Sequence, residues 1–320
     1  NKIFPEEKRS LQPSVVSVLR CLLEEFKQAF KSANNTSFSD IGGVPFGFYG
    51  AFGYELLFQF EKDHKRSFER CGDEKLFHLF FVDNIYLLDK RKEKAYQCNL
   101  DLSKNKINTK NLCSNPYKKL KTKYSKQSSN PTIKPNISAK KYENFVIKAK
   151  EKMRQGEIFE VVPSRKFLSD YPDKPSILFK RMQKNNPSPY EFYCQFNDEQ
   201  LIGTSPEMFV RVTDKRIESC PISGTIKRGD NPIEDSKRIQ QLLNSYKDEV
   251  ELTMCTDVDR NDKSRVCTPG SIKLLARRSI ETYANLFHTV DHVEGTLRKD
   301  LIGIDGFLSH MWAVTLTGAP

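Results

Sequence analysis

The sequence has no long hydrophobic run and no closely spaced cysteine pair. No window approaches the roughly 18 to 20 consecutive apolar residues that a transmembrane helix needs, so no membrane partner is expected. The eight cysteines form no C-x-x-C pair, which predicts neither a zinc site nor a redox motif and favours reduced thiols in a cytoplasmic protein. The chain opens with Asn1, without a methionine or a signal sequence, and we expect a fragment at both ends.

Composition indicates a folded globular protein. Of the 320 residues, 38% are hydrophobic and 29% are charged, which argues against disorder. The net charge of +11 is the kind of excess that binds nucleic acid. Much of the excess lies between Ser103 and Lys141, where lysines mix with Asn, Ser and Thr without interleaved aromatics or helical period. We interpret 103–138 as a linker or surface loop rather than a nucleic-acid arm, and no nucleic-acid partner is predicted.

The region before this linker, 1–102, is predicted to be a sheet with covering helices. Apolar residues at helical spacing predict an amphipathic helix within 1–37 that ends near Asn34. The glycine and aromatic run 44–54 predicts a buried strand with close backbone approach. Alternating residues predict two more strands, one over 76–89 and one over 94–102.

The region after the linker, 139–320, interleaves helices and strands without the strict alternation of a Rossmann unit. This pattern predicts an α+β or α/β protein with large antiparallel sheets. The expected helices are 140–156, with Phe145, Ala149 and Met153 inward, and 174–185, with Asp173 as its N-cap. The expected strands are 158–163, 190–197, 271–275 and 283–293.

The stretch from Leu201 to Asp262 is predicted to form the site. Two short strands meet at a bend at Ser205, a polar glycine turn covers 220–229, and a helix with Asp235 as N-cap continues through Asp257. In the turn, two glycines permit close backbone approach, and hydroxyl and cationic side chains suit an anion. The residues concerned are Ser223, Gly224, Thr225, Lys227, Arg228 and Gly229.

Two carboxylates on the following helix are candidates for Mg²⁺. Asp248 and Glu251 are three residues apart and share a face, whereas Glu249 points away. The alternatives are a solvated helix face for this pair and an ordinary hairpin for the turn. His288 and His292 are four apart, which would suit a metal pair on a helix, although the local pattern favours a strand and structural hydrogen bonding.

Several segments in this order and spacing resemble the chorismate-utilising enzymes, and most closely the synthase component of anthranilate synthase. The resemblance implies two large antiparallel sheets packed face to face, with helices outside and the site between them. The segments are Glu157–Arg165, Asn186–Tyr190, Gly203–Glu207, Pro221–Thr225 with Arg228–Gly229, Asp257–Asp262 and Thr317–Pro320, with a weaker match over Tyr49–Tyr54.

The resemblance also implies residue roles. Asp248 and Glu251 match one of two metal-binding carboxylate pairs, with Asp248 standing where the family usually has Glu. Glu207 matches the general acid toward the departing hydroxyl, and His288 matches the histidine associated with pyruvate loss. Thr225 is a further catalytic candidate. Substrate binding is expected from Ser223, Gly224, Thr225, Thr317 and Gly318, and a partial tryptophan feedback site from Asn186, Pro187, Ser188, Pro189 and Tyr190.

Two positions discriminate among reactions. Related enzymes that add water use a lysine as base where this chain has Glu160, and those that aminate at the para position carry a lysine where it has Ser223. Both differences favour ortho amination of chorismate by ammonia, followed by elimination of pyruvate to give anthranilate in tryptophan biosynthesis. The alternatives are a phenazine-type synthase that stops at the aminated intermediate, an isochorismate or aminodeoxychorismate synthase, and an inactive scaffold.

The resemblance implies partners as well. Ammonia would come from a glutamine amidotransferase, as a subunit or a fused C-terminal domain, and 281–294 looks most like the fused type. A homo-oligomer and tryptophan inhibition are both compatible with it. The chain stops at Pro320, before the family's second metal carboxylate pair and carboxylate-binding arginine, so we expect this fragment to be inactive or nearly so.

Overall fold

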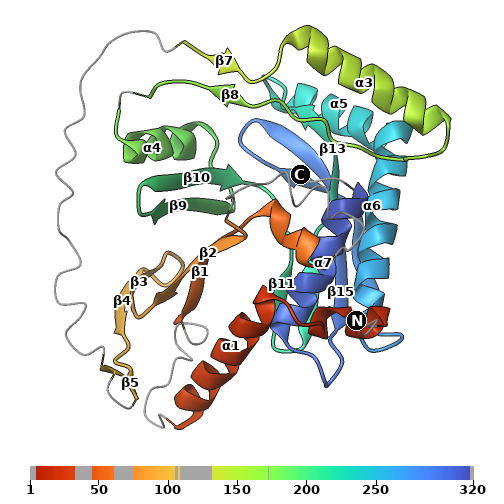
Figure 1. The fold of residues 1–320 in the computed structure, drawn as a ribbon. Coiled ribbons are helices and arrows are strands. Elements are labelled where there is room, and N and C mark those ends of the chain that lie inside the picture. The colour runs from red at the N-terminus through yellow and green to blue at the C-terminus, as the bar shows by residue number, and fades with distance from the viewer. Residues whose placement is uncertain are drawn as a thin grey trace. The chain divides into compact units, whose positions relative to one another are not determined.

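The computed structural model describes residues 5–32, 45–60, 75–104, 107–108, 132–171 and 173–317 (Figure 1). Its contacts divide the chain into a smaller unit, Pro13–Lys123, and a larger unit that joins Asn1–Gln12 to Tyr124–Pro320. Among the described residues, no helix is long and apolar enough to cross a membrane. The expected division at 102 and 138 stays a prediction.

The described residues of the smaller unit form an α-helix, a 3-10 helix and short antiparallel ladders. The predicted N-terminal helix is α1 (Val15–Ser32), and the residues near its expected end at Asn34 lie outside the described residues. The segment predicted as one strand over 76–89 is two, because the chain bends at Asp83 and β2 and β3 pair with different partners. The other elements are η3 (Tyr54–Gln59), β1 (Gly47–Phe52), β2 (Phe77–Val82), β3 (Asn84–Asp89), β4 (Lys94–Asn99), β5 (Ser103–Lys104) and β6 (Ile107–Asn108).

Aromatic packing joins α1 to the β1–β2 ladder within this unit. The ring of Phe26 on α1 stacks on Phe81 with centroids 4.0 Å apart, and Phe48 meets both rings edge-on. Gly50 faces β2 so closely that a Cβ would lie 2.0 Å from the carbonyl oxygen of His78. The close backbone approach predicted for this glycine-rich segment is therefore confirmed.

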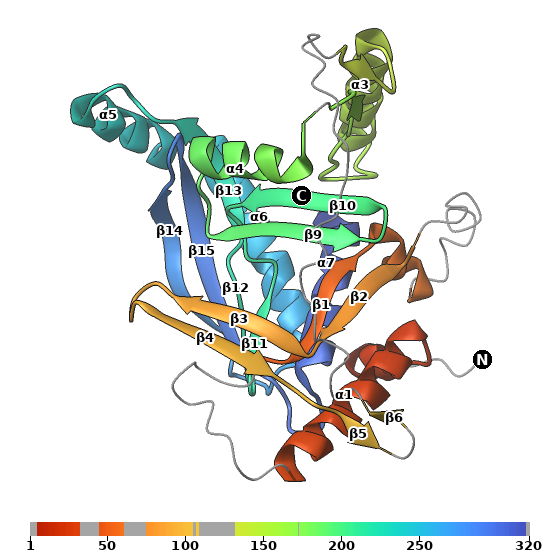
Figure 2. The same ribbon diagram turned by 90° about the vertical axis from the view of Figure 1, so that its left-hand side faces the viewer.

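The larger unit is built on a five-stranded antiparallel sheet with β15 (Leu286–Thr296) at its centre. On one side, β15 pairs with β14 (Lys273–Thr282) (Figure 2). On its other side, β15 pairs with β13 (Ile222–Lys227) and with β12 (Arg216–Ser219). Strand β12 pairs in turn with β11 (Arg211–Thr213). The α+β class is confirmed, and every pair of strands in the described residues is antiparallel. The other sheets there are two-stranded.

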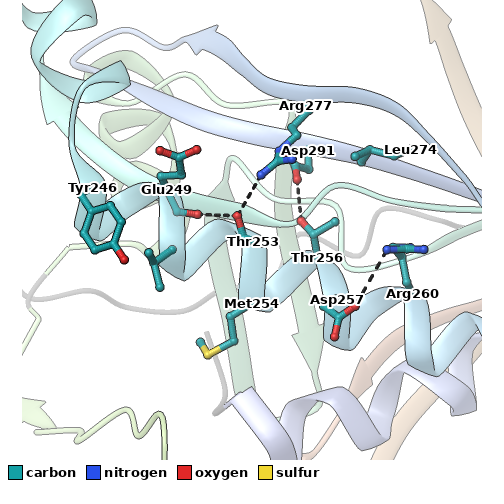
Figure 3. Close-up of a pocket in the computed structure, with 11 residues that line it drawn as sticks. Tyr246, Glu249, Thr253, Met254, Thr256, Asp257, Arg260, Leu274, Arg277 and Asp291 are labelled. Carbon is teal, nitrogen blue, oxygen red and sulfur yellow. Dashed lines mark hydrogen bonds and ion pairs between the residues drawn. The ribbon is translucent and has the colours of Figure 1, made fainter.

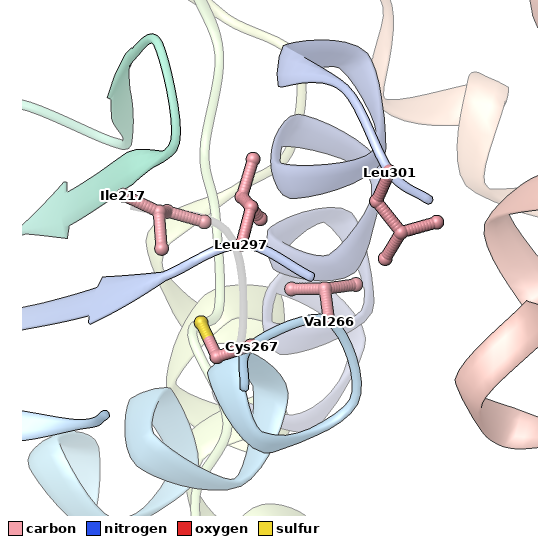
Figure 4. Packing of buried hydrophobic residues seen from close by; sticks show 5 residues of the cluster. All are labelled: Ile217, Val266, Cys267, Leu297 and Leu301. Atoms are coloured by element: carbon pink, nitrogen blue, oxygen red, sulfur yellow. The ribbon is translucent and has the colours of Figure 1, made fainter. Parts of the chain in front are cut away.

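A compact apolar cluster closes one end of this sheet (Figure 4). Ile217 and Leu301 are fully buried, and the cluster also holds Val266, Cys267 and Leu297. A β-bridge between Cys267 and Leu297 joins the segment after α6 to the segment after β15. The cluster fixes the C-terminal end of α6 (Tyr246–Ser264) beside the sheet and the start of α7 (Gly303–Thr317). The 3-10 helix η1 (Glu6–Leu11) is tied to α7 because the buried Ser10 hydroxyl donates to Asp305 over 2.7 Å.

Three predictions between residues 139 and 197 were wrong in detail. Helix α3 (Ala139–Arg154) is capped by Ser138, but Phe145 and Met153 are 41% and 38% exposed and do not face a core. The predicted strand 158–163 has no ladder partner among the described residues, and β7 (Lys134–Pro135) pairs instead with β8 (Phe167–Leu168). Helix α4 (Pro175–Asn185) has Lys174 as N-cap in place of the predicted Asp173, whose carboxylate forms an ion pair with Arg181. The strand predicted over 190–197 is β9 (Tyr190–Phe196), which pairs with β10 (Glu199–Ser205).

The central stretch also differs from its prediction. The expected glycine turn is strand β13, because its backbone completes the ladder to β15. The single predicted helix is two, α5 (Pro232–Leu243) and α6, with Asn231 and Ser245 as N-caps. Asp235 is not a cap; its carboxylate accepts hydrogen bonds from Arg228 and from the Gly229 backbone N–H.

Candidate functional site

The site is organised by a bulge in β13 at Gly224. The ladder to β15 shifts register between Ile222 and Thr225, and Gly224 has φ +88°, a region that side chains rarely allow. A Cβ there would lie 2.6 Å from Thr289 Oγ1 and 3.0 Å from Asp248 Cβ. The glycine therefore lets β13 approach both β15 and α6, which brings Asp248 beside the bulge.

His288 on β15 lies directly opposite Thr225 on β13. Its Nδ1 is 2.9 Å from Thr225 Oγ1 and 3.4 Å from the Gly224 carbonyl oxygen. Because a carbonyl only accepts, we assign the proton to Nδ1, which leaves the lone pair on Nε2. Burial lowers the pKa of His288, against a smaller raising effect of the Gly224 carbonyl and the Glu281 charge, so the neutral imidazole is favoured near neutral pH.

Ser223 supplies a buried hydroxyl at the same strand. The residue is 6% exposed, and its Oγ has no hydrogen-bond partner among the described residues. Its carbonyl accepts a hydrogen bond from Thr289 on β15, which fixes the backbone. A buried hydroxyl without a partner is costly, so this group is available to a ligand.

Three glutamates gather around Cys255 on α6. Burial first, and then the charges of Glu160, Glu251 and Glu207, raise the pKa of the Cys255 thiol to about 12. Burial also raises the pKa of Glu207. Burial followed by the charge of Glu251 raises the pKa of Glu160, whose buried Oε2 has no hydrogen-bond partner in the described part of the chain. The fold thus brings together Glu207 and Glu251, which are far apart in sequence, and adds Glu160.

The metal candidates Asp248 and Glu251 share a face of α6, as predicted. The exposed Lys247 lies 4.0 Å from Asp248 and 3.5 Å from Glu251. Glu249 points elsewhere and pairs with Arg278 at 3.3 Å. No group of three or more His, Cys, Asp or Glu side chains in the described residues forms a ready metal cage. The two oxygen donors fit an ion such as Mg²⁺, which commonly binds one or two carboxylates and completes its shell with water and substrate.

The remaining predicted residues lie elsewhere or beyond the description. The segment 186–190 joins α4 to β9: Asn186 Nδ2 donates to Thr204 Oγ1 over 3.3 Å, and the Ser188 hydroxyl donates to the Asn186 carbonyl over 3.1 Å. Pro187 and Pro189 flank Ser188, and Tyr190 is 41% exposed at the start of β9. Thr317 is the last residue of α7, while Gly318 lies outside the described residues.

A cavity of about 680 Å³ lies on another face of α6 (Figure 3). None of the predicted site residues lines it. Several of its polar groups bond to one another: Arg277 donates to Thr253 over 3.3 Å, and Thr256 donates to Asp291 over 2.7 Å. We therefore place the candidate site at the bulge of β13 and not in this cavity.

Two features of the site were missed from the sequence. Tyr283 packs edge-on against His288, with ring centroids 5.3 Å apart, and Lys263 forms a buried ion pair with Asp259. The i,i+4 spacing of Asp259 and Lys263 could have indicated their ion pair. The contact of Tyr283 with His288 depends on the β14–β15 hairpin, which the sequence pattern did not resolve.

Comparison with known proteins assigns a family. The model of the chorismate binding enzyme family matches residues 6–320. Anthranilate synthase of Azospirillum brasilense is 42% identical over 99% of this chain and 41% of its own length. Anthranilate synthase component 1 of Acetivibrio thermocellus is 30% identical over 100% of this chain and 67% of its own. The chain thus spans less than half of the first relative and about two thirds of the second.

Solved structures support the fold. The crystal structure of anthranilate synthase component I from Streptococcus pneumoniae superposes with a TM-score of 0.70 at 24% identity, over 90% of this chain and 65% of that one. The crystal structure of a Bacillus anthracis protein assigned as a 2,3-dihydroxybenzoate-specific isochorismate synthase superposes with a TM-score of 0.53 at 18% identity, over 84% of this chain and 67% of that one. With its motifs, fold and relatives in agreement, the chain belongs to the chorismate binding enzyme family and is homologous to anthranilate synthases.

Proposed function

We propose that the complete polypeptide containing this chain is an anthranilate synthase. It would aminate chorismate at the ortho position with ammonia derived from glutamine and then eliminate pyruvate. The observation that carries the proposal is the pairing of His288 with Thr225 at the bulge of β13, close to the segment that bears Glu207. Relatives that bear the name anthranilate synthase support it.

Glu207 is suited to the first step. In amination, nitrogen bonds to the ortho carbon of the ring while the ring hydroxyl leaves, and that hydroxyl needs a proton to depart as water. Because burial raises the pKa of Glu207, its carboxyl group holds a proton to higher pH than an exposed glutamate does. We assign it the role of general acid.

His288 is suited to the second step. Elimination removes the proton from the aminated ring carbon, releases the enolpyruvyl group as pyruvate and leaves an aromatic ring. A neutral imidazole with its proton on Nδ1 can accept that ring proton at Nε2. Thr225 fixes the ring orientation through Nδ1.

The pair Asp248 and Glu251 would hold Mg²⁺ together with a substrate carboxylate. The ion, when bound, would neutralise substrate charge and orient the ring. The buried hydroxyl of Ser223, which has no partner in the described part of the chain, would donate a hydrogen bond to the anionic substrate. Thr317 and Gly318 are proposed substrate contacts as well.

The residues at the two discriminating positions disfavour other reactions. Ser223 and Glu160 are not amines, so neither can act as a lysine nucleophile at the ring or as a lysine base toward water. Ammonia itself is then the nucleophile. A glutamine amidotransferase, fused or separate, is the proposed source, and the segment 186–190 is the proposed part of a tryptophan inhibition site.

The direct test is product analysis. The complete polypeptide, incubated with chorismate, Mg²⁺ and ammonium, should release fluorescent anthranilate and an equal amount of pyruvate. Isochorismate or a para-aminated product as the main species would refute the assignment. Accumulation of the aminated intermediate without pyruvate would indicate a phenazine-type synthase instead.

A further inference from the structure

Tyr283 occupies a position between the two proposed catalytic groups. It follows β14 at the hairpin to β15, where its backbone N–H donates to the Leu286 carbonyl over 2.9 Å. Its ring meets the imidazole of His288 edge-on, with centroids 5.3 Å apart and planes at 71°. An edge-to-face contact of this kind restricts the rotation of the imidazole ring.

The hydroxyl of Tyr283 makes contacts that the ring does not make. Its single proton is shared between two acceptors, the carboxylate of Glu281 and, at 3.4 Å, the carbonyl oxygen of Pro206, the residue before Glu207. Glu281 is itself the ladder partner of His288. Burial, followed by the hydrogen bond to Glu281, raises the pKa of Tyr283, so the hydroxyl stays a donor at physiological pH.

Thr225 and Tyr283 hold the imidazole in complementary ways. Thr225 binds Nδ1 from the β13 side, and the Tyr283 ring contacts the imidazole from the hairpin that joins β14 to β15. A phenylalanine would make the same ring contact, so the packing against His288 does not require the hydroxyl. The hydroxyl instead connects this hairpin to the backbone before Glu207.

We propose that Tyr283 is a positioning residue that holds the His288 imidazole with its ring and the Pro206–Glu207 backbone with its hydroxyl, which Glu281 orients. The inference rests on the proposed function for what His288 and Glu207 do. The two parts of one side chain then serve two different steps: the hydroxyl acts on amination and the ring acts on elimination.

Two substitutions separate these parts in the complete polypeptide. Tyr283→Phe keeps the ring and removes the hydroxyl, so chorismate consumption should slow about tenfold, as loss of one hydrogen bond allows, with pyruvate released for each chorismate consumed. Tyr283→Leu also removes the ring, so pyruvate release should fall at least about tenfold below chorismate consumption while the aminated intermediate accumulates. Tyr193→Phe is the matched control, since its hydroxyl bonds Gln200 on β10, and it should keep wild-type rates.

The outcomes divide clearly. Stoichiometric pyruvate release by Tyr283→Leu, or wild-type rates in Tyr283→Phe, would overturn the proposal. If Tyr283→Leu does not fold, the rate of Tyr283→Phe decides.

An NMR measurement tests the positioning without any assay. The His288 imidazole proton resonances, identified by their loss in His288→Gln, should move in Tyr283→Leu and stay in place in Tyr283→Phe. If the wild-type protein makes no anthranilate, the proposed function fails while this measurement still tests the contact; unmoved resonances in Tyr283→Leu would overturn it.

Discussion

Lys263 and Asp259 form a buried ion pair in the larger unit. They lie one turn apart on α6, with Nζ 2.9 and 2.7 Å from the two carboxylate oxygens, and Lys263 is 0% exposed. Asp259 also accepts hydrogen bonds from Ser219 at the end of β12 and from His310 on α7. One carboxylate therefore ties together the helix of the metal candidates, the central sheet and α7.

Replacing Lys263 with methionine should destabilise the fold strongly. The substitution leaves the Asp259 charge buried without its cation, which costs about 3 to 5 kcal/mol in unfolding free energy, measured by urea denaturation. The matched control is Arg260→Met, because Arg260 pairs with Asp257 at 3.9 Å on the exposed face of the same helix and should contribute less than about 1 kcal/mol. Equal losses in the two variants would contradict a buried ion pair.

Asp262 should make stability fall as pH rises above about 4. Burial, opposed by the charge of Arg265, raises the pKa of Asp262 to about 6, from 3.8 for an ordinary aspartate. Since the folded-state pKa is the higher one, the stabilisation is complete below pH 3.8 and is lost as pH rises through 6. Relative to Asp262→Asn, the wild type should lose on the order of 2 to 3 kcal/mol in this window.

The neighbouring Asp259 does not confuse this measurement. Burial acts to raise its pKa, but the hydrogen bond from His310 and the charges of His310 and Lys263 outweigh burial and lower the pKa to about 2. Its contribution is lost only as pH falls below about 4. A difference between wild type and Asp262→Asn that does not change from pH 4 to 7 would contradict the prediction for Asp262.

Glu251→Gln should abolish Mg²⁺-dependent turnover in the complete polypeptide. The amide removes the anionic oxygen that an ion held by α6 requires. Turnover of chorismate is measured over a Mg²⁺ titration, with calorimetry of Mg²⁺ binding in the presence of chorismate as a second measurement. Glu249→Gln, two residues away and paired with Arg278, should keep the wild-type Mg²⁺ dependence. A wild-type titration curve for Glu251→Gln would remove this residue from the site.

His288→Met should separate the two chemical steps. If the imidazole serves only elimination, chorismate is still consumed, little pyruvate appears, and the aminated non-aromatic intermediate accumulates on chromatography. His292→Gln is the control, since His292 lies on the same face of β15 and contacts Glu218 at 3.2 Å. Equal loss of both steps in His288→Met would indicate a structural or general binding role.

The segments predicted correctly are those whose local pattern agrees with their surroundings. Helix α1, helix α4 and strand β9 follow from apolar periodicity, and helix α3 ends before Gly156, whose φ is positive. The predicted strand 158–163 was wrong because alternation creates a strand only where a partner edge is available. The single helix predicted after residue 235 was wrong because Ser245 caps a new helix, which local period alone does not reveal.

The sequence by itself determined the family, the α+β class and the candidate residues of the site. Ordered motifs specify these features because each motif consists of residues that are adjacent in the sequence. Only the tertiary structure decided that Gly224 lies against Asp248, that Glu160 joins Glu207 and Glu251, and that Tyr283 packs on His288. Some of these contacts join residues that are far apart in the chain, and the others depend on the register of a hairpin. Strand pairing and burial determine both kinds of contact, and no local sequence pattern encodes them.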